Sequence, residues 1–440
     1  MTFATLQADA RACFAAAVAA AEPGRAVGHA LTREGDALVL RGGAGDELAR
    51  HVGPVCVVGA GKASVAMARA VRVIVGPALV DGLVIAPHGS GVEQAGPMHV
   101  RHGAHPVPDT AGVAATRALL DVVRAADATT LVLAVLSGGA SALLVAPSEG
   151  ISLADKQELT RALLTAGAEI SGLNAVRKHC SRVKGGGVAR AAAGAHACWA
   201  FVLSDVVGDD LATIGSGPTV PDPTTYRDAL DVLVRYGVSA PPAIEAHLRR
   251  GAGGEVPETP KPGDALFDRV LTTCVAGNAD AVAGAVAEAR RRGYVVTVWT
   301  APIDGDAAVA GERIARALRS LPGAAPVALI AGGETTVRAR SGGLGGRSQH
   351  VALAAALGIT GLRAVVLAAG TDGIDGPTPA AGACVDGDTV ARAHRMHLDP
   401  AAALIATDSH RVLSATGDLV ATGPTGTNVA DVVVALRAAT

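Results

Sequence analysis

Short apolar segments in this chain run repeatedly into glycine-rich loops that carry one or two charged or hydroxyl residues. The clearest of these segments lie at residues 55–64, 131–141, 201–217, 327–335, 365–376 and 423–428. Glycine lets the backbone approach an anion without a Cβ in the way, so strand ends of this kind present amide N–H groups to phosphates in α/β enzymes. Six such loops in one chain predict a nucleotide or phosphorylated ligand held between several strand ends.

The apolar segments alternate with helical patterns, which is typical of parallel sheets covered by helices on both faces. We expect strands at 55–58, 83–86, 131–136, 200–204, 270–276, 294–299, 327–331, 364–369 and 383–385. We expect helices at 62–75, 110–126, 153–170, 174–192, 225–238, 279–292, 306–320, 347–358 and 428–438. The sequence therefore predicts an α/β protein.

A chain of 440 residues is too long for one ordinary hydrophobic core and predicts two domains. Residues 239–265 concentrate proline, glycine and charge, so we place the boundary in this segment. The predicted division is an N-terminal domain over 1–245, a linker over 246–265 and a C-terminal domain over 266–440.

Composition argues against several classes of partner. A net charge of −2 offers no basic surface for nucleic acid. No run of eighteen uncharged apolar residues predicts a membrane span, and the alanine-rich N-terminus carries Asp9 and Arg11, which favours an amphipathic helix over a signal peptide. Six scattered cysteines without a C-x-x-C pair predict reduced thiols and a cytoplasmic protein.

Lysine is rare, with five lysines against 33 arginines, and two of the five, Lys62 and Lys184, adjoin glycine runs. A compact ammonium suits a phosphate site. The loop GAGKAS (59–64) lacks the first glycine and the hydroxyl residue of a P-loop. It also lacks the third glycine of a dinucleotide fingerprint, and the strand at 83–86 ends without a ribose-binding acid. Two interpretations remain, a plain turn with a surface lysine or a Lys62 that acts on a phosphoryl group from a helix N-terminus.

Arg347 follows two glycines and opens a predicted helix, where its guanidinium could bind a carboxylate or phosphate or simply be solvated. The segment GTDGIDG (370–376) resembles a carboxylate loop for a hard cation but is too short for an EF-hand, and a plain turn is the alternative.

Asp205, Asp209 and Asp210 crowd together after a predicted strand, which suits either Mg²⁺ or a helix cap. His99, His102 and His105 are spaced by three, but a loop with glycine and proline does not hold that spacing on one face, so we expect no zinc site there.

Nine segments in this order resemble the class II glycerate 2-kinase family, whose C-terminal part is the MOFRL domain. They are VVGAGKAS (57–64), GAHPVPD (103–109), LSGGASALL (136–144), LNAVRKHCSRVKGGG (173–187), SDVVGDDLATIGSGPTVPD (204–222), GGETTV (332–337), GGRSQ (345–349), GTDGIDGPT (370–378) and TGPTGTNVADV (422–432). The resemblance implies a Rossmann-like N-terminal α/β/α domain, a smaller C-terminal α/β domain and an active site in the cleft between them. It also implies ATP-dependent phosphorylation of the 2-hydroxyl of D-glycerate with Mg²⁺.

On this resemblance the functional lysine of the family falls on Lys62 and the arginine on Arg347, both offsetting charge on the transferring phosphoryl group. We expect nucleotide contacts from Gly59, Gly61, Ser137, Gly138, Gly139, Ser141, Lys184, Gly332, Gly333, Thr335, Gly370 and Asp372. Arg347 or His105 would hold the glycerate carboxylate. Asp205 or Glu334 would lie near Mg²⁺, and Asp205 is the first candidate for a general base.

One departure from the family pattern concerns Arg347 directly. His350 stands where the family motif GGRNQE has its glutamate, so the sequence predicts that a neighbouring carboxylate that could orient Arg347 is missing. The alternatives left open are an NAD(P)H-dependent hydroxypyruvate reductase, a kinase for another small hydroxy acid, and a nucleotide-binding sensor without catalysis. The sequence also leaves the oligomeric state open, a homodimer included.

Overall fold

The chain forms two compact units in the computed structural model, which describes residues 1–89, 94–95, 97–338 and 342–439. The N-terminal unit is Pro23–Val275, and the C-terminal unit combines Met1–Glu22 with Ala276–Thr440. Each unit contains sheets and helices, so the predicted α/β class is confirmed. The division differs from the predicted one at both ends of the N-terminal unit.

The N-terminal unit alternates strands and helices along most of its length. Its elements are α2 (Pro23–Ala30), β1 (Leu31–Glu34), β2 (Ala37–Arg41), β3 (Glu47–His51), β4 (Val55–Ala60), α3 (Ser64–Val75), η1 (Gly76–Ala78), β5 (Leu79–Pro87), β6 (Gln94–Ala95), β7 (Met98–Gly103), α4 (Thr110–Ala125), β8 (Leu131–Ser137), α5 (Ala140–Leu143), α6 (Leu153–Thr165), α7 (Ile170–His179), α8 (Gly187–Ala191), β9 (Ala197–Leu203), η2 (Ile214–Ser216), α9 (Tyr226–Arg235), α10 (Pro242–Ala252), η3 (Ala265–Arg269) and β10 (Val270–Ala276).

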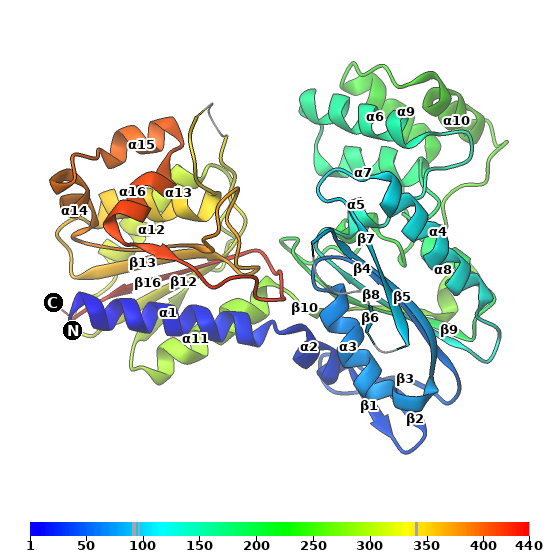
Figure 1. Cartoon of the computed structure of the whole chain (residues 1–440), viewed down its shortest axis with the longest axis horizontal. Helices are drawn as coiled ribbons and strands as arrows, with labels where there is room; N and C mark the ends of the chain where they lie inside the picture. Colours follow the sequence, from blue (N-terminus) through cyan, green and yellow to red (C-terminus); the bar gives the residue numbers. More distant parts are fainter. Residues whose placement is uncertain (90–93, 96, 339–341, 440) are drawn as a thin grey trace. The chain divides into compact units, whose positions relative to one another are not determined.

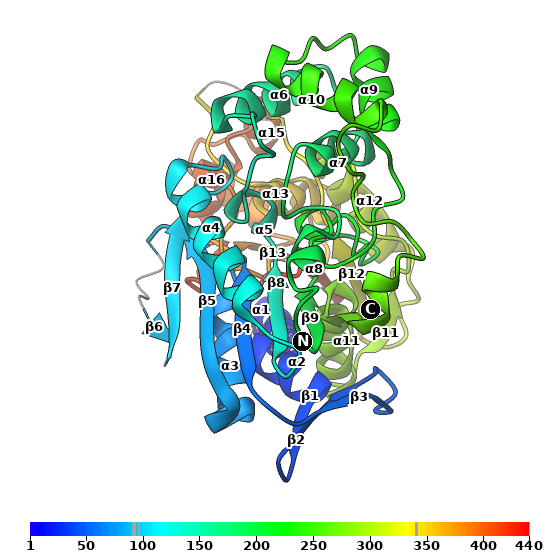
Figure 2. The same cartoon turned by 90° about the vertical axis from the view of Figure 1, so that its right-hand side faces the viewer.

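A seven-stranded sheet in the order β10-β9-β8-β4-β5-β7-β6 forms the centre of this unit. The strands from β9 to β7 run parallel to one another, and Figure 2 looks onto them in succession. Helix α3 lies on one face, whereas α4 and α8 pack on the other over an apolar core (Figure 1). This is the Rossmann-like arrangement that the sequence predicts. Because β10 extends this sheet beside β9, residues 246–265 lie within the N-terminal unit and are not a linker between units.

Two further parts of the N-terminal unit were not expected. Strands β1, β2 and β3 form a small antiparallel sheet. Helices α6, α7, α9 and α10 form a separate helical cluster with its own core around Leu163, Val176, Tyr226 and Ile244.

The predicted helix at 174–192 is two helices in the structure, because α7 ends at His179 and α8 begins only at Gly187. Gly185 and Gly186 adopt φ angles of 52° and 77°, in the left-handed region that favours glycine. The three glycines at 185–187 therefore end the helical pattern and turn the chain.

The C-terminal unit is built around a six-stranded sheet. Its elements are α1 (Phe3–Ala20), α11 (Asn278–Arg291), β11 (Val295–Val298), α12 (Ala307–Ser320), β12 (Val327–Gly333), α13 (Arg347–Ile359), β13 (Ala364–Gly370), β14 (Gly382–Asp386), α14 (Thr389–Arg395), α15 (Pro400–Ala406), α16 (Ser409–Thr416), β15 (Leu419–Val420) and β16 (Asp431–Arg437).

This sheet has the order β11-β12-β16-β13-β14-β15, and only β11 and β12 pair in parallel. The expectation of a parallel sheet is therefore wrong for this unit. The predicted helix at 428–438 is also wrong, since Asp431–Arg437 is the strand β16. Every residue of β16 is buried, and β-branched Val432, Val433 and Val434 suit a central strand that pairs with β12 and β13 on its two sides.

Helices α1 and α11 cover one face of this sheet, and α12 and α13 cover the other (Figure 1). Helix α1 confirms the predicted N-terminal helix and buries Leu6, Ala10, Cys13, Phe14 and Ala17. This apolar stripe explains why the first 22 residues belong to the C-terminal unit, although the sequence places them in the other one. Among the described residues, no helix is long and apolar enough to cross a membrane.

Candidate active site

The loop after β4 is tied to the loop after β8. The Lys62 N–H donates to the Gly138 carbonyl at 2.9 Å, and the Ala63 N–H donates to Ser137 Oγ at 2.9 Å. Gly61 has a φ of 136°, and a Cβ there would come 2.1 Å from Ser137 Oγ, so only glycine fits. These two amides are therefore used within the protein, and the Lys62 side chain, rather than the backbone beside it, is the part of this loop that suits an anion.

The glycine turn after β8 brings two of the predicted site residues together. Gly139 has a φ of 85°, and a Cβ there would come 3.1 Å from His105 Cδ2 and 3.6 Å from Lys62 Cγ. His105, two residues beyond β7, thus lies close to Lys62 although 43 positions separate them. Larger side chains at 139 would fill the space that these two residues share.

These loops flank the position where the order of the sheet reverses. From β4 the chain adds β5 and β7 on one side and then returns to add β8 and β9 on the other. In open α/β sheets, ligands bind at the carboxyl ends of the strands, at such a topological switch point. The Lys62 and Ser137–Ser141 loops follow β4 and β8, the two strands at this point, so they form the N-terminal part of the candidate site.

Two predicted nucleotide-binding residues have structural roles here. Gly59 lies inside β4, where a Cβ would come 2.4 Å from the Val135 side chain. Ser137 is fully buried, and its hydroxyl accepts the Ala63 N–H. Both residues are buried, and they hold the loops after β4 and β8 in place.

Lys184 is also buried, and it anchors the loop that contains Ser141. Its ammonium donates to the Ser141 carbonyl at 2.8 Å, to Ser141 Oγ at 3.0 Å and to the Gly215 carbonyl at 3.3 Å. Burial, followed by the charges of Arg177 and Lys156, lowers the pKa of Lys184 well below its usual value. Its three donors are all used, so we assign Lys184 to the support of the Ser141 loop.

Asp205 stands two residues after the end of β9, beside the Ser137–Ser141 loop in the sheet order. The neighbouring Asp210 accepts hydrogen bonds from Ala212 N at 3.0 Å and Thr213 Oγ1 at 2.6 Å. Asp210 therefore stabilises the turn that follows, and it does not cap a helix, because η2 begins after Thr213 without a side-chain cap. The roles of Asp205 near Mg²⁺ and as a general base stay predictions.

Arg347 in the C-terminal unit is held by two carboxylates. Its Nε donates to Asp431 Oδ2 at 2.6 Å and its Nη2 to Asp431 Oδ1 at 3.0 Å, while Nη1 donates to Glu334. The expectation of a missing orienting carboxylate is therefore wrong. The two carboxylates come from the end of β12 and the start of β16, and Asp431 pairs in register with Gly333 and Gly370.

Burial and the ion pair both shift the pKa values of Asp431 and Arg347. The Asp431 side chain is 5% exposed, and burial raises its pKa despite the Arg347 guanidinium, which opposes the rise. Burial would lower the pKa of Arg347, but Asp431 and Glu334 together raise it above its usual value. Arg347 therefore stays charged, and the carboxylates fix its orientation.

Asp375 occupies the N-terminus of α13, directly beside Arg347. Its carboxylate accepts the backbone N–H groups of Ser348 at 3.0 Å and Gln349 at 2.8 Å. Burial raises the pKa of Asp375 to about 6. The helix thus uses Asp375 as a cap, and within the segment GTDGIDG only Asp372 remains as a candidate ligand.

The remaining predicted residues of this unit gather at the same edge of the sheet. Gly332 and Gly333 end β12, Gly370 ends β13, and Asp372 follows two residues later. A Cβ at Gly370 would come 3.2 Å from Asp372 Oδ1 and 3.4 Å from Asp431 Oδ1. Thr335 is buried, and its hydroxyl has no hydrogen-bond partner within the described residues.

The described residues of the two units contain no preformed metal centre. Across the described residues, no group of three or more His, Cys, Asp or Glu side chains gathers in a geometry that could hold a metal ion. Mg²⁺ bound to a nucleotide needs only one or two protein carboxylates, because phosphates and water supply its other ligands.

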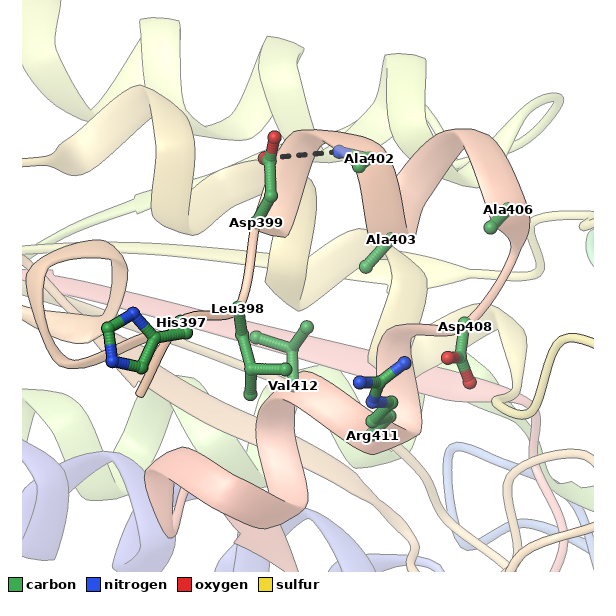
Figure 3. A pocket seen from close by; sticks show the side chains of 9 residues that line it. All are labelled: His397, Leu398, Asp399, Ala402, Ala403, Ala406, Asp408, Arg411 and Val412. Carbon is green, nitrogen blue, oxygen red and sulfur yellow. Dashed lines mark hydrogen bonds between the residues drawn. The ribbon is translucent and has the colours of Figure 1, made fainter. Parts of the chain in front are cut away.

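Hollows among the described residues also lie away from these loops. One of about 480 Å³ lies in the helical cluster and is lined by residues such as Lys178, Tyr226 and His247, and one of about 670 Å³ lies beside it, next to the start of α4. Another, of about 270 Å³, lies between α15 and α16 (Figure 3). Its lining residues are His397, Leu398, Asp399, Ala402, Ala403, Ala406, Asp408, Arg411 and Val412. None of the three contains a predicted site residue.

Two family models match this chain. Residues 9–249 match the model of a domain of unknown function, DUF4147, and residues 327–431 match the MOFRL family. A glycerate 2-kinase from Pyrococcus horikoshii is 38% identical over 96% of this chain and 94% of its own length. The chain belongs to the class II glycerate kinase family.

A solved structure extends this relationship to the fold. The crystal structure of a glycerate kinase from Thermotoga maritima matches with a TM-score of 0.85 and 34% identity, over 98% of this chain and 99% of its own. A relative from Agrobacterium vitis, 39% identical over 96% of this chain and 92% of its own, bears a provisional name, hydroxypyruvate reductase. Names within the family thus point to two reactions.

Sequence reasoning missed several residues that shape the site. Asp431 lies within a segment that the sequence assigns to a helix, and for the segment of Asp375 the sequence leaves a cation loop and a plain turn open. Asn174 and Ser216, which hydrogen-bond at 3.1 Å beneath the Ser141 loop, gave no signal beyond their place in the family motifs. A buried valine run directly after an aspartate is the pattern that could have identified β16.

Proposed function

We propose that this protein is an ATP-dependent glycerate 2-kinase that converts D-glycerate to 2-phospho-D-glycerate. Membership of a family that includes a named glycerate 2-kinase, over nearly the whole of both chains, carries the proposal. The site geometry supports it, because phosphoryl transfer needs positioned positive charge and little covalent chemistry. Lys62, in the loop after β4, and Arg347, the first residue of α13, supply that charge.

The surroundings of the remaining residues support the roles we propose for them. His105 lies beside Lys62 across Gly139, which supports a role for it in binding the glycerate carboxylate near the reacting hydroxyl. Asp205 at the end of β9 is the proposed general base. Arg347 is locked by Asp431 and Glu334, so it can offset phosphoryl charge without reorganisation.

ATP and Mg²⁺ are the proposed co-substrate and metal. The strand ends at Gly333 and Gly370 carry Glu334, Asp372 and Asp431 around the single cation Arg347 among the residues named here. An excess of carboxylate charge is stabilised by a divalent cation. Glu334 is the carboxylate in this unit that we propose to lie near Mg²⁺, and Asp205 is the corresponding candidate in the other unit.

The structure gives less support to hydroxypyruvate reductase activity. A dinucleotide site needs an acidic residue at the end of the second strand to bind the ribose. Strand β5 ends at Pro87, and His88 follows it. The first loop also uses the Lys62 and Ala63 amides internally, so they are not available to a pyrophosphate.

Two assays run in parallel test the proposal. Purified protein is given ATP, Mg²⁺ and D-glycerate with ADP release as the readout, and separately NADH with hydroxypyruvate. We expect glycerate-dependent ADP release and no NADH oxidation, with 2-phosphoglycerate as the product by NMR. NADH oxidation without ADP release would favour the reductase, 3-phosphoglycerate would change the acceptor hydroxyl, and ATP binding without turnover would favour a sensor.

We also propose that the reaction takes place in the cytoplasm. The six cysteines form no disulfide, and five of them are buried. Thiols of this kind are typical of reducing compartments. Fractionation of cells that produce the protein would test this placement.

A further inference from the structure

Three cationic side chains lie close together near the Ser141 loop, and within the described residues none of them forms an ion pair with an acid. Lys184 is 2% exposed, Lys156 is 9% exposed, and Arg177 of α7 is half-buried. We call these three residues the cation cluster. Burial lowers the pKa of all three, and the charge of Arg177 lowers the pKa values of both lysines further. The three positive groups are therefore close enough to repel one another.

The hydrogen bonds of the cation cluster go only to neutral oxygens. Lys156 donates to the Cys180 carbonyl at 2.7 Å, and the ammonium of Lys184 is shared between Ser141 and Gly215. Within the described residues, Arg177 forms neither a hydrogen bond nor an ion pair. Buried positive charge without an anionic partner is costly, and cationic groups in this state are typical of anion-binding sites.

The helix places Arg177 on the side of the Ser141 loop. Asn174 lies three positions earlier on α7, so the two side chains share a face of the helix. Asn174 Oδ1 accepts a hydrogen bond from Ser216 Oγ at 3.1 Å, and Ser216 Oγ lies 3.1 Å from Ser141 Oγ. Ser216 is fully buried and holds a φ of 63°, so this link is rigidly built.

We propose that Arg177 is an oxyanion-binding residue of the active site, completing with Ser141 a subsite for a carboxylate or phosphate group of the substrates. This inference rests on the proposed kinase function, which supplies two such groups, the glycerate carboxylate and the ATP phosphates. The planar guanidinium offers paired donors that match either group. Lys184 and Lys156 strengthen the positive field from behind, and Lys184 keeps Ser141 in place.

The test compares Arg177→Gln and Arg177→Lys with Arg235→Gln, which removes an exposed arginine on α9 of the same helical cluster. Thermal unfolding of each full-length protein is measured alone and with D-glycerate, with ATP and Mg²⁺, or with inorganic phosphate. The KM for each substrate is measured in parallel. We expect Arg177→Gln to raise one KM about 10- to 100-fold and to lose the matching thermal shift, with a smaller effect of Arg177→Lys and none of Arg235→Gln.

The pattern of loss identifies the ligand. Loss of the glycerate shift alone assigns the subsite to the carboxylate, and loss of the ATP shift alone assigns it to a phosphate. We also expect ligand-free Arg177→Gln to be at least as stable as wild type, because it relieves repulsion. If it is less stable while every ligand shift and KM is retained, Arg177 is structural and the proposal is overturned.

The phosphate arm separates this inference from the proposed function. If the wild-type protein shows no glycerate-dependent turnover but Arg177→Gln loses a shift caused by inorganic phosphate, the subsite stands and the kinase assignment fails. If turnover is present and no shift or KM depends on Arg177, the kinase assignment stands and the subsite fails.

Discussion

The Asp431 carboxylate binds the Arg347 guanidinium through two hydrogen bonds, although 84 residues separate them in the sequence. Asp431 begins β16, which pairs with both β12 and β13, and Arg347 begins α13. The pair therefore links the start of α13 to the strand ends that precede Glu334 and Asp372. This relationship makes Asp431 a positioning residue for Arg347.

We expect Asp431→Asn to lower kcat about 10- to 100-fold, because Arg347 loses its fixed orientation. The free energy of unfolding should fall by about 1–3 kcal/mol. The matched control is Asp418→Asn, which removes a comparable buried partner from Arg392 in the same unit and should lower stability while sparing kcat. In an Arg347→Ala background, Asp431→Asn should cause no further loss of kcat; a full additional loss would show that Asp431 acts independently.

Lys62→Ala should lower kcat by about 10² or more, because a positive group that offsets phosphoryl charge is removed. Its thermal unfolding should match wild type, since the Lys62 and Ala63 amides keep their hydrogen bonds to Gly138 and Ser137. Arg72→Ala, at an exposed position on α3, is the control. Unchanged turnover of Lys62→Ala would remove Lys62 from the mechanism. A double-mutant cycle with Arg347→Ala measures whether both cations act on one group.

Asp375 should give the C-terminal unit a pH-dependent stability. Burial raises its pKa from 3.8 to about 6, so the folded protein holds this proton more tightly than the unfolded chain. This stabilisation is fully present below about pH 4 and is lost as the pH rises through about 6, a change of roughly 3 kcal/mol. Asn at this position stays neutral. The free energy of unfolding of Asp375→Asn, measured in urea, should therefore rise relative to that of the wild type between pH 4 and 7. A constant difference over that range would contradict the prediction.

Lys156 should have the opposite pH dependence in the alkaline range. Burial lowers its pKa from 10.5 to about 8, so the unfolded chain binds this proton more tightly. The resulting penalty of roughly 3 kcal/mol is present below about pH 8 and is relieved as the pH rises toward 10.5. Lys156→Met should remove this rise in stability, as measured by denaturant unfolding between pH 7 and 10. A wild-type slope that survives the substitution would assign it to another group.

Helix α1 should stabilise the C-terminal unit and not the unit that follows it in the sequence. Leu6 is fully buried, so Leu6→Ala should lower the free energy of unfolding by about 2–5 kcal/mol. Hydrogen exchange should increase in α11, β13 and β16 and stay unchanged in β4 and β8. The exposed Val73→Ala on α3 is the control. Increased exchange confined to β4 and β8 would contradict the division of the chain.

The central strands of the N-terminal unit could be predicted from the sequence, because their pattern is local in the chain. Strands such as β4 and β8 are short runs of buried apolar residues with a glycine turn at the end, and parallel strands joined by helices leave this pattern in sequence order. The same pattern correctly indicated that Lys62, Ser137 and Ser141 lie at strand ends. It failed at 428–438, because a short apolar run of valine, alanine and leucine suits either a buried helix or a buried strand.

The sequence by itself determined the α/β class, the glycine loops and the residue types at the candidate site, because these depend on local backbone preference and local chemistry. Only the tertiary structure decided that α1 belongs with residues 276 onward and that Asp431 orients Arg347. It also brought Arg177, Lys156 and Lys184 close together without an acidic partner among the described residues. Those relationships join segments far apart in the chain, and their energies depend on burial and on distance in space, which the order of residues does not record.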